Sequence, residues 1–152
     1  MEIIIKKAET IEECKACNQM LTELISYEIP FDDQIVQRLN IEDHYERLLN
    51  KDDAIIFLGI YNGKIVGYVA AYKNAPKNSK ECFVTIMNIF VKVEFRKMGI
   101  GNLLIKQVQE WAKEKFSISI IELDCYINNK SAMDFYSKLD FKPIRVKMRK
   151  EL

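Results

Sequence analysis

The amino-acid sequence predicts an α/β (α+β) fold with a mixed, mostly antiparallel central sheet. Two strand-like runs, residues 54–61 and 64–72, are joined by Asn62-Gly63. A two-residue Asn-Gly turn favours an antiparallel hairpin because both residues tolerate positive φ. Further along, strand-like residues 81–93 and 118–126 enclose an amphipathic helical run, and a strand–helix–strand crossover favours parallel pairing. The sheet is therefore expected to be mixed.

The N-terminal third of the chain predicts one strand followed by helices. Residues 2–7 are a short run rich in isoleucine and read as a first strand. Thr10 and Glu13 fit a capping box, in which each side chain accepts a hydrogen bond from the other residue's backbone N–H. The helix that they start is expected to run to about Tyr27 with one apolar side. Residues 31–49 are predicted to be further helix.

The C-terminal half alternates helical and strand-like runs. An amphipathic helix is predicted over residues 103–115, followed by a strand over residues 118–126. Residues 129–139 read as a second amphipathic helix. Residues 141–148 read as a last strand, interrupted by Pro143. No composition shift marks a boundary, so residues 1–152 are expected to form a single domain.

Composition excludes several classes of protein. The formal net charge is +1, so there is no basic excess to neutralise phosphates and nucleic acid is not an expected partner. No apolar run approaches the length of a membrane span, and no membrane association is expected. The apolar stretch near the N-terminus is too short for a secretory signal. A cytoplasmic location is the resulting expectation.

The four cysteines are expected to be free thiols. Cys14 and Cys17 form a Cys-x-x-Cys pair, but no second ligand pair accompanies it and His44 is the only histidine. A redox pair would open a helix after a strand, whereas this pair lies inside a helical run. Cys82 and Cys125 fall in runs that read as strand. The interpretation is buried thiols in a reducing compartment, with no metal site.

The central stretch of the chain is a strand that runs through a glycine-containing turn into a helix. We call residues 96–102 the glycine turn. The first N–H groups of a helix have no internal partners and carry a partial positive charge, which suits an anion such as a phosphate. Gly99 and Gly101 remove side chains from this turn, and Arg96 and Lys97 add positive charge. The stretch predicts a site for a diphosphate-bearing cofactor.

Two motifs in this half of the chain resemble those of one family. Residues 96–101, Arg-Lys-Met-Gly-Ile-Gly, match the Arg/Gln-x-x-Gly-x-Gly/Ala signature of the GNAT superfamily of acetyl-CoA-dependent N-acetyltransferases. Residues 129–141 match that family's Asn-x-x-Ala-x-x-Leu/Phe-Tyr-x-x-x-Gly-Phe. Val93 replaces a frequent proline, and Asp140 replaces a usual glycine. Asp140 is therefore expected to adopt a left-handed C-cap.

The resemblance implies a fold and an activity. The fold would be GNAT-like, with a central sheet of about seven strands, helices on both faces, and fourth and fifth strands that are parallel and splayed. The activity would be that of an N-acetyltransferase, an acyltransferase that moves the acetyl group of acetyl-CoA to a primary amine by direct transfer in a ternary complex.

The resemblance also implies which residues hold the cosubstrate. Backbone groups of Ile89, Phe90 and Val91 would pair with the pantetheine arm and the thioester carbonyl, like an added strand. Asn129 would contact the cofactor near the pantetheine or support the strand edges, and it could also cap its own helix. The pyrophosphate would bind at the glycine turn, formed by Arg96, Lys97, Met98, Gly99, Ile100, Gly101 and Asn102.

The same resemblance suggests catalytic groups. Tyr136 stands where the family carries a general acid for the leaving thiolate, although a tyrosine on an apolar helix face can also be a core residue. Asp124 stands where related enzymes carry a glutamate that serves as base, but it could equally be a solvated strand carboxylate. Glu28, Asp32 and Asp33 are alternative carboxylates that would base-catalyse the reaction or bind a cationic acceptor.

Two readings of function stay open at this stage. The first is the enzyme, whose acceptor would be a small-molecule amine or a peptide N-terminus. The alternative is a non-catalytic acyl-CoA-binding or sensing domain that has lost its acceptor. The first helices and the loops over the strands set acceptor specificity in such a fold, and they carry no signature. A homodimer is a possible assembly.

Overall fold

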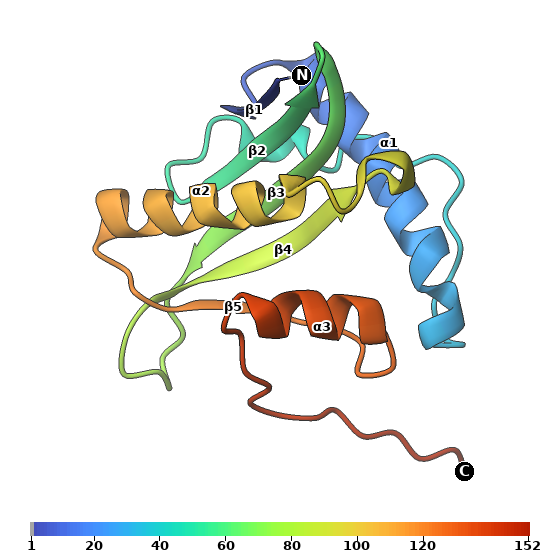
Figure 1. Cartoon of the computed structure of the whole chain (residues 1–152). Helices are drawn as coiled ribbons and strands as arrows, with labels where there is room; N and C mark the ends of the chain where they lie inside the picture. The colour runs from blue at the N-terminus through green and yellow to red at the C-terminus, as the bar shows by residue number, and fades with distance from the viewer. Residues whose placement is uncertain (1) are drawn as a thin grey trace.

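A computed structural model describes residues 2–152 of the chain and shows one five-stranded sheet with helices on both faces (Figure 1). The strands lie in sequence order across the sheet. β1 to β4 are antiparallel neighbours, and β4 pairs with β5 in parallel. Their bounds are β1 Ile3–Lys7, β2 Ala54–Tyr61, β3 Lys64–Asn74, β4 Phe83–Val91 and β5 Ile121–Leu123.

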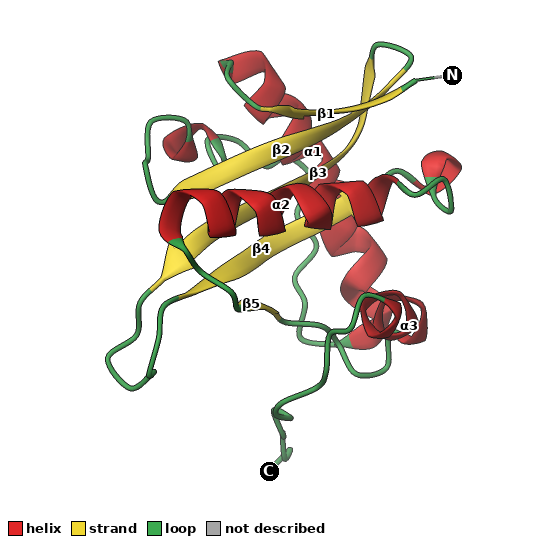
Figure 2. Ribbon diagram, turned by 60° about the vertical axis from the view of Figure 1, so that its left-hand side comes forward, coloured by secondary structure: helices red, strands yellow, loops and turns green. Residues whose placement is uncertain are grey.

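The helices cover opposite faces of the sheet. Helix α1, Ile11–Glu28, packs on one face, and α2, Ile100–Phe116, lies across the other (Figure 2). Each face of the sheet has its own hydrophobic core, and alternate residues of a strand point into one or the other. In β2, Ile56 and Leu58 face α1, whereas Ile55 and Phe57 face α2. The last helix, α3, is Lys130–Lys138. Short 3₁₀ turns are η1 Ile29–Phe31, η2 Glu46–Leu48 and η3 Val93–Phe95.

Local sequence signals determine several of these boundaries. The Thr10 hydroxyl accepts the backbone N–H of Glu13 at 3.2 Å, and the Glu13 carboxylate accepts that of Thr10 at 3.2 Å, which confirms the capping box. Asn62 and Gly63 have φ of 48° and 79°, which confirms the predicted hairpin turn. The parallel pairing of β4 with β5 is also confirmed.

A one-residue bulge in β4 changes which face its side chains meet. Ala71 pairs with Ile86 but Ala70 pairs with Asn88, so Met87 is the extra residue. Before the bulge Ile86 packs under α2; after it Phe90 packs under α1. Side chains alternate with a period of two, so one inserted residue exchanges the two faces.

A buried polar network lies on the α1 side of this bulge. The Tyr45 hydroxyl donates to Asn88 Oδ1 at 2.6 Å and lies 2.7 Å from the Tyr68 hydroxyl. Since Tyr45 has a single proton, Tyr68 must donate to Tyr45. The Asn18 side chain accepts the backbone N–H of Tyr45 at 3.2 Å and donates to Glu46 at 2.6 Å. These bonds tie the segment before β2 to the middle of β4.

The prediction of about seven strands was wrong: residues 2–152 form five. Residues 141–148 are extended but pair with no strand, and we call residues 142–152 the C-terminal segment. Alternating apolar residues form a strand only where the edge of another strand is within reach. The sequence does not reveal whether such an edge is present. The strand predicted over residues 54–61 matches β2, and the one over residues 64–72 falls two residues short of the end of β3. Two predictions were too long: residues 81–93 pair only over Phe83–Val91, and residues 118–126 only over Ile121–Leu123.

The helix predicted over residues 31–49 was also wrong, because this segment is mostly loop. Ile41, Tyr45 and Leu48 are buried at helix-like spacing, which explains the prediction. The backbone of Asp43 is left-handed, with φ of 52°, so no α-helix passes through it. The Asp32 carboxylate accepts the N–H of Gln34 at 3.0 Å, a local bond that favours a turn over a helix.

None of the helices within residues 2–152 has the length and apolar character needed to cross a membrane.

The Tyr45 network predicts a defined loss of stability. Tyr45→Phe removes one hydroxyl and leaves Asn88 Oδ1 and the Tyr68 hydroxyl without their partner. We expect the free energy of unfolding to fall by about 1–3 kcal/mol in urea titrations, since buried polar groups without partners carry that cost. Tyr126→Phe, which changes a hydroxyl outside the network, is the matched control. Equal stability of the two variants would contradict this account.

Candidate active site

The candidate site begins where β4 and β5 diverge. Their pairing ends at Ile86 with Leu123, one residue before the bulge, whereas β4 continues to Val91. Among the described strands, only β3 pairs with β4 beyond that point. We call the space between the diverging ends of β4 and β5 the opening. Residues 89–91, the predicted pantetheine-binding residues, lie on the edge of β4 that faces it. An extended molecule can add to such an edge through backbone hydrogen bonds.

The glycine turn follows β4 after Lys92 and the short 3₁₀ turn η3. Lys97 and Gly99 have φ of 64° and 86°, and Gly99 is the N-cap of α2. The first helical N–H with an intrahelical partner is that of Leu103, which donates to the Gly99 carbonyl at 3.1 Å. Within the described chain, the backbone N–H groups of residues 97–102 donate to no carbonyl. The turn therefore offers several amide donors and the helix dipole to an anion.

Arg96 ties the glycine turn to its surroundings. Its Nε donates to the Val91 carbonyl at 2.8 Å, so one of the backbone groups predicted to meet a cofactor is already engaged. Its guanidinium carbon lies 4.9 Å from the Tyr27 ring centroid and 5.4 Å from that of Phe90. A cation over aromatic faces is stabilised by the ring quadrupoles. Arg96 thus holds the turn against both α1 and β4.

An open pocket of about 380 Å³ adjoins Arg96. It lies between the C-terminal half of α1 and the end of β4, next to the glycine turn. Sequence reasoning missed the α1 residues of this pocket because their polar side chains read as a solvated helix face. The lining residues are Thr22, Glu23, Ser26, Tyr27, Phe90, Val93 and Arg96.

The two glycines of the turn serve different purposes. A Cβ on Gly99 would meet no atom within 4 Å, so this glycine is needed for its positive φ. A Cβ on Gly101 would lie 3.0 Å from Cζ of Phe135 in α3. Gly101 therefore allows the first turn of α2 to pack closely on α3. That packing role was not apparent from the sequence.

Helix α3 carries the second motif. Asn129 is buried and caps the helix by accepting the Ala132 N–H at 3.2 Å; its amide nitrogen donates to no protein group within residues 2–152. Asp140 has φ of 67°, which confirms the expected left-handed C-cap. The N–H groups of Asp140 and Phe141 close the helix on the Ser137 and Tyr136 carbonyls at 3.1 and 3.0 Å.

Tyr136 is half-buried between two phenyl rings. Its ring meets those of Phe135 and Phe141 edge-on, with centroids 5.3 and 5.6 Å apart. Burial raises the pKa of the phenol well above its ordinary value, and nearby Cys125 and Glu28 raise it further. Its hydroxyl makes no hydrogen bond to another residue of the described chain. Tyr136 therefore stays protonated at neutral pH and keeps its donor available.

Glu28, the last residue of α1, is a carboxylate whose charge acts on this tyrosine. It is half-buried, and burial raises its pKa. Burial raises the pKa of Cys125, Tyr126 and Tyr136, and the charge of Glu28 raises each of them further. Asp124, the predicted base, directly follows β5 and is exposed.

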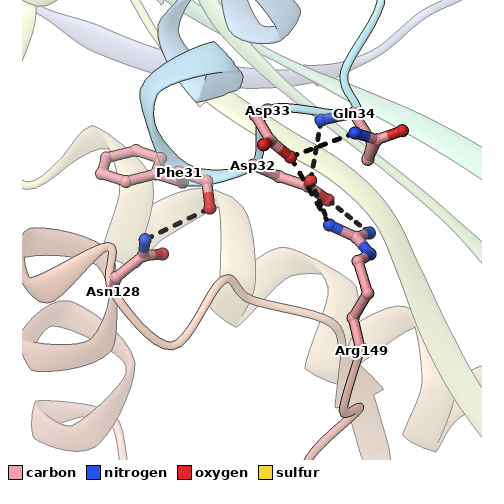
Figure 3. Close-up of polar contacts among 6 residues, drawn as sticks. All are labelled: Phe31, Asp32, Asp33, Gln34, Asn128 and Arg149. Carbon is pink, nitrogen blue, oxygen red and sulfur yellow. Dashed lines mark hydrogen bonds and ion pairs between the residues drawn. The ribbon is translucent and has the colours of Figure 1, made fainter. Parts of the chain in front are cut away.

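Asp32 and Asp33 contact an arginine from the other end of the chain (Figure 3). Arg149 donates to both Asp32 oxygens at 2.7 and 3.2 Å and lies 3.9 Å from Asp33. This pairing, with the Gln34 N–H, lowers the pKa of Asp32 to about 2. Asn128 also reaches this loop, donating to the Phe31 carbonyl at 3.2 Å. Sequence reasoning found no signal for these long-range contacts.

The cysteines lack the features of nucleophiles or ligands. Cys14 and Cys17 are buried in α1, and burial raises the pKa of Cys14 to about 11 and that of Cys17 higher still. A thiol with a raised pKa is a poor source of thiolate. Within the described residues, no three metal-ligating side chains of His, Cys, Asp or Glu lie close enough to hold an ion.

Comparison with known proteins identifies the family. Residues 18–141 match the acetyltransferase (GNAT) family, so the chain belongs to this family of acyltransferases, whose members use acetyl-CoA as cosubstrate. An uncharacterized N-acetyltransferase of Methanocaldococcus jannaschii, MJ1207, is 37% identical over 99 residues, covering 64% of this chain. The matched part is only 43% of that relative's length.

Two further matches add detail. The N-alpha-acetyltransferase of Sulfurisphaera tokodaii is 27% identical over 129 residues, covering 75% of this chain and 76% of its own. An X-ray structure of a tetramutant of the BH1408 protein from Bacillus halodurans superposes with a TM-score of 0.84 at 21% identity, covering 98% of this chain and 99% of the other. The structural match shows the shared fold.

Proposed function

We propose that this protein is an N-acetyltransferase that moves the acetyl group of acetyl-CoA to a primary amine by direct transfer in a ternary complex. Two neighbouring features carry this proposal: the open edge of β4 and, a few residues further along the chain after η3, the unpaired amides of the glycine turn. An acyl-CoA has a matching shape, a pantetheine arm that can pair like a strand and a pyrophosphate that needs amide donors.

The residues present fit this cosubstrate. Ile89, Phe90 and Val91 would hold the pantetheine through their backbone, with Arg96 occupying the Val91 carbonyl at the far end. The amides from Lys97 to Asn102, including Met98, Gly99, Ile100 and Gly101, would hold the pyrophosphate. The free amide nitrogen of Asn129 would reach the pantetheine from α3. When bound, acetyl-CoA supplies an activated acyl group as a thioester.

Tyr136 is the proposed general acid. Its raised pKa makes it a weaker acid than an ordinary phenol, and a thiol of pKa about 8.5 is already stronger than a phenol of pKa about 10. The Tyr136 hydroxyl would therefore stabilise the developing thiolate by donating a hydrogen bond, more than by transferring its proton completely. The free hydroxyl, between two phenyl rings that restrict its orientation, supports that role.

The acceptor amine must lose a proton before it attacks. Forming the free amine from an alkylammonium costs about 4–5 kcal/mol at pH 7, so a base contributes directly to the rate. Asp124 and Glu28 are the two candidates. The features of Glu28 favour it: a raised pKa makes its carboxylate the better proton acceptor, and its charge acts on Tyr136. Asp124 stays the second candidate.

The acceptor class follows from chemistry and from relatives. A half-buried carboxylate at the opening suits a cationic amine, either a small molecule or a peptide N-terminus. The Sulfurisphaera tokodaii relative is named an N-alpha-acetyltransferase, which supports the peptide N-terminus. Thioester cleavage with polyamines, aminoglycosides, amino acids and N-terminal peptides tests the proposal. Tight CoA binding with no thiol release for any acceptor would favour the sensing domain instead.

Tyr136→Phe tests the general acid. We expect kcat to fall by about 100-fold while the affinity for acetyl-CoA changes little, because the hydroxyl acts on the leaving group and not in ground-state binding. Steady-state kinetics and calorimetric binding of CoA give the two quantities. Tyr72→Phe is the control, since it removes a phenol from β3 beside the start of β4, away from the opening. An equal loss of turnover and affinity would contradict the acid role.

Glu28→Gln and Asp124→Asn distinguish the two bases. For Glu28→Gln we expect kcat/KM to fall at neutral pH and to recover as pH rises, because the free-amine fraction then grows without a base. Asp124→Asn should keep nearly wild-type values across the same pH series. The reverse pattern, with the pH-dependent loss in Asp124→Asn, would assign the base to Asp124.

Gly99→Ala and Gly63→Ala form a matched pair for the glycine turn. Both glycines have positive φ, and a Cβ on either would meet no atom within 4 Å. Each variant should lose about 1–2 kcal/mol of stability from the left-handed backbone. Only Gly99→Ala should also weaken CoA binding, because only that strain moves the amides of residues 97–102. Equal CoA affinity in both variants would argue against phosphate binding at this turn.

A further inference from the structure

The protein holds one end of the Asn88 side-chain amide and leaves the other end open. Its Oδ1 atom accepts the Tyr45 hydroxyl at 2.6 Å, and the Tyr68 hydroxyl donates to Tyr45 over 2.7 Å. Within residues 2–152, Asn88 Nδ2 donates to no protein group, and Glu46 Oε2 is the buried side-chain atom without a partner. Asn88 Nδ2 is therefore reached by solvent, and its N–H bonds point in a direction that Tyr45 fixes.

Asn88 lies at the start of the opening, on the face of the sheet that α1 covers. It directly follows Met87, the extra residue of the bulge, and the pairing of β4 with β5 ends just before it, at Ile86. The next residue, Ile89, packs on the α2 side, and Phe90 packs on the α1 side again. The open amide thus lies beside the backbone that is proposed to bind the thioester, but out of the plane of the sheet.

The proposed cosubstrate leaves the α1 face of the opening to the acceptor. Its pantetheine would occupy the edge of β4 in the plane of the sheet, where the thioester carbonyl would pair with backbone groups. Tyr136 packs with the core on the α2 side, so the sulfur atom would lie toward that side. The amine would then reach the acyl carbon from the α1 face, where Asn88 lies.

Glu28 and the open pocket lie along the same face. Burial raises the pKa of Tyr68 and the charge of Glu28 raises it further, so Glu28 lies near the network that holds Asn88. The pocket of about 380 Å³ is lined by Phe90, two residues after Asn88, and by Tyr27, the residue before Glu28. An acceptor between Glu28 and Asn88 therefore has room to continue into this pocket.

On the basis of the acetyl transfer proposed above, we infer that Asn88 Nδ2 donates a hydrogen bond to a carbonyl oxygen of the acceptor. The acceptor is then an α-amino acyl compound, such as a peptide N-terminus or an amino-acid amide, and not a plain alkylamine. Only two carbon atoms separate the amine from the carbonyl oxygen in such a compound. Neighbouring groups on one face can thus bind both, with Glu28 at the amine and Asn88 at the oxygen.

Matched acceptors test this assignment. Leucinamide is compared with isopentylamine, and phenylalaninamide with phenethylamine, because each pair differs only by the carboxamide group. For every acceptor, kcat/KM of a variant is divided by that of the unaltered protein. The lower basicity of an α-amino group relative to an alkylamine cancels in this ratio.

Asn88→Asp removes the open donor and keeps an oxygen that accepts the Tyr45 hydroxyl. We expect kcat/KM to fall about 10- to 100-fold with the carboxamides, because their carbonyl loses its donor, and not to fall with the plain amines. Tyr45→Phe releases the Asn88 side chain and should cause a smaller loss that is equally selective. Calorimetric binding of CoA shows whether each variant keeps the cosubstrate site.

Asn74→Asp is the matched control. It makes the same chemical change on β3, at the end where β4 and β5 are paired, where the Asn74 amide donates to Thr85 at 3.2 Å. This variant should keep its kcat/KM with all four acceptors.

The outcomes separate this inference from the proposed function. An equal loss with carboxamides and plain amines in Asn88→Asp would overturn the inference, because the donor would then act on the acyl group. Unchanged kcat/KM with the carboxamides would overturn it as well. If the unaltered protein binds CoA but acetylates no amine of either kind, the proposed acetyl transfer itself is wrong.

Discussion

The structure depends most on the extra residue in β4. Met87 shifts the strand by one position against β3, and pairing with β5 ends one residue earlier. A bulge bends a strand and increases its twist, so two strands that start in parallel contact separate beyond it. The same residue sends Asn88 and Phe90 toward α1 instead of α2. The opening, the pocket beside α1 and the Tyr45 network all follow from this shift.

Several titratable side chains around the opening are shifted toward their neutral forms. Glu28, Cys125, Tyr126 and Tyr136 all have raised pKa values, and burial is the first cause in each case. Partial removal of water also strengthens the interaction between Glu28 and the others. Under the proposed function, the protonated donor would serve the leaving thiolate and the carboxylate of increased basicity would serve the acceptor amine.

Two ties close the molecule around this opening. Arg96 links the glycine turn to β4 and α1, and Arg149 links the C-terminal segment to the loop after α1. Both use a planar guanidinium, which can combine directed hydrogen bonds with contacts to ring faces or both carboxylate oxygens. The first tie is local in sequence and the second spans almost the whole chain. The position of the loop after α1 therefore depends on a residue near the C-terminus of the chain, Arg149.

Local chemistry in the sequence determined much of the fold and the outline of the site. The Thr10 capping box, the Asn62-Gly63 turn and the left-handed Asp140 depend on short-range geometry, which a few neighbouring residues define. The glycine turn could be recognised for the same reason. The parallel pairing of β4 with β5 could be predicted because a strand–helix–strand crossover favours that arrangement. The helix predicted over residues 31–49 was wrong because Ile41, Tyr45 and Leu48 are buried at helical spacing without forming a helix.

Only the tertiary structure decided the features that need distant partners. Residues 141–148 carry a strand pattern, yet a strand exists only where another edge accepts its hydrogen bonds. Other features likewise depend on segments that are far apart in sequence: the bulge at Met87, the contact of Gly101 with Phe135, the electrostatic interaction of Glu28 with Tyr136, and the Arg149–Asp32 pair. The sequence determined which chemical groups each segment carries, and tertiary packing determined which of these groups come into contact.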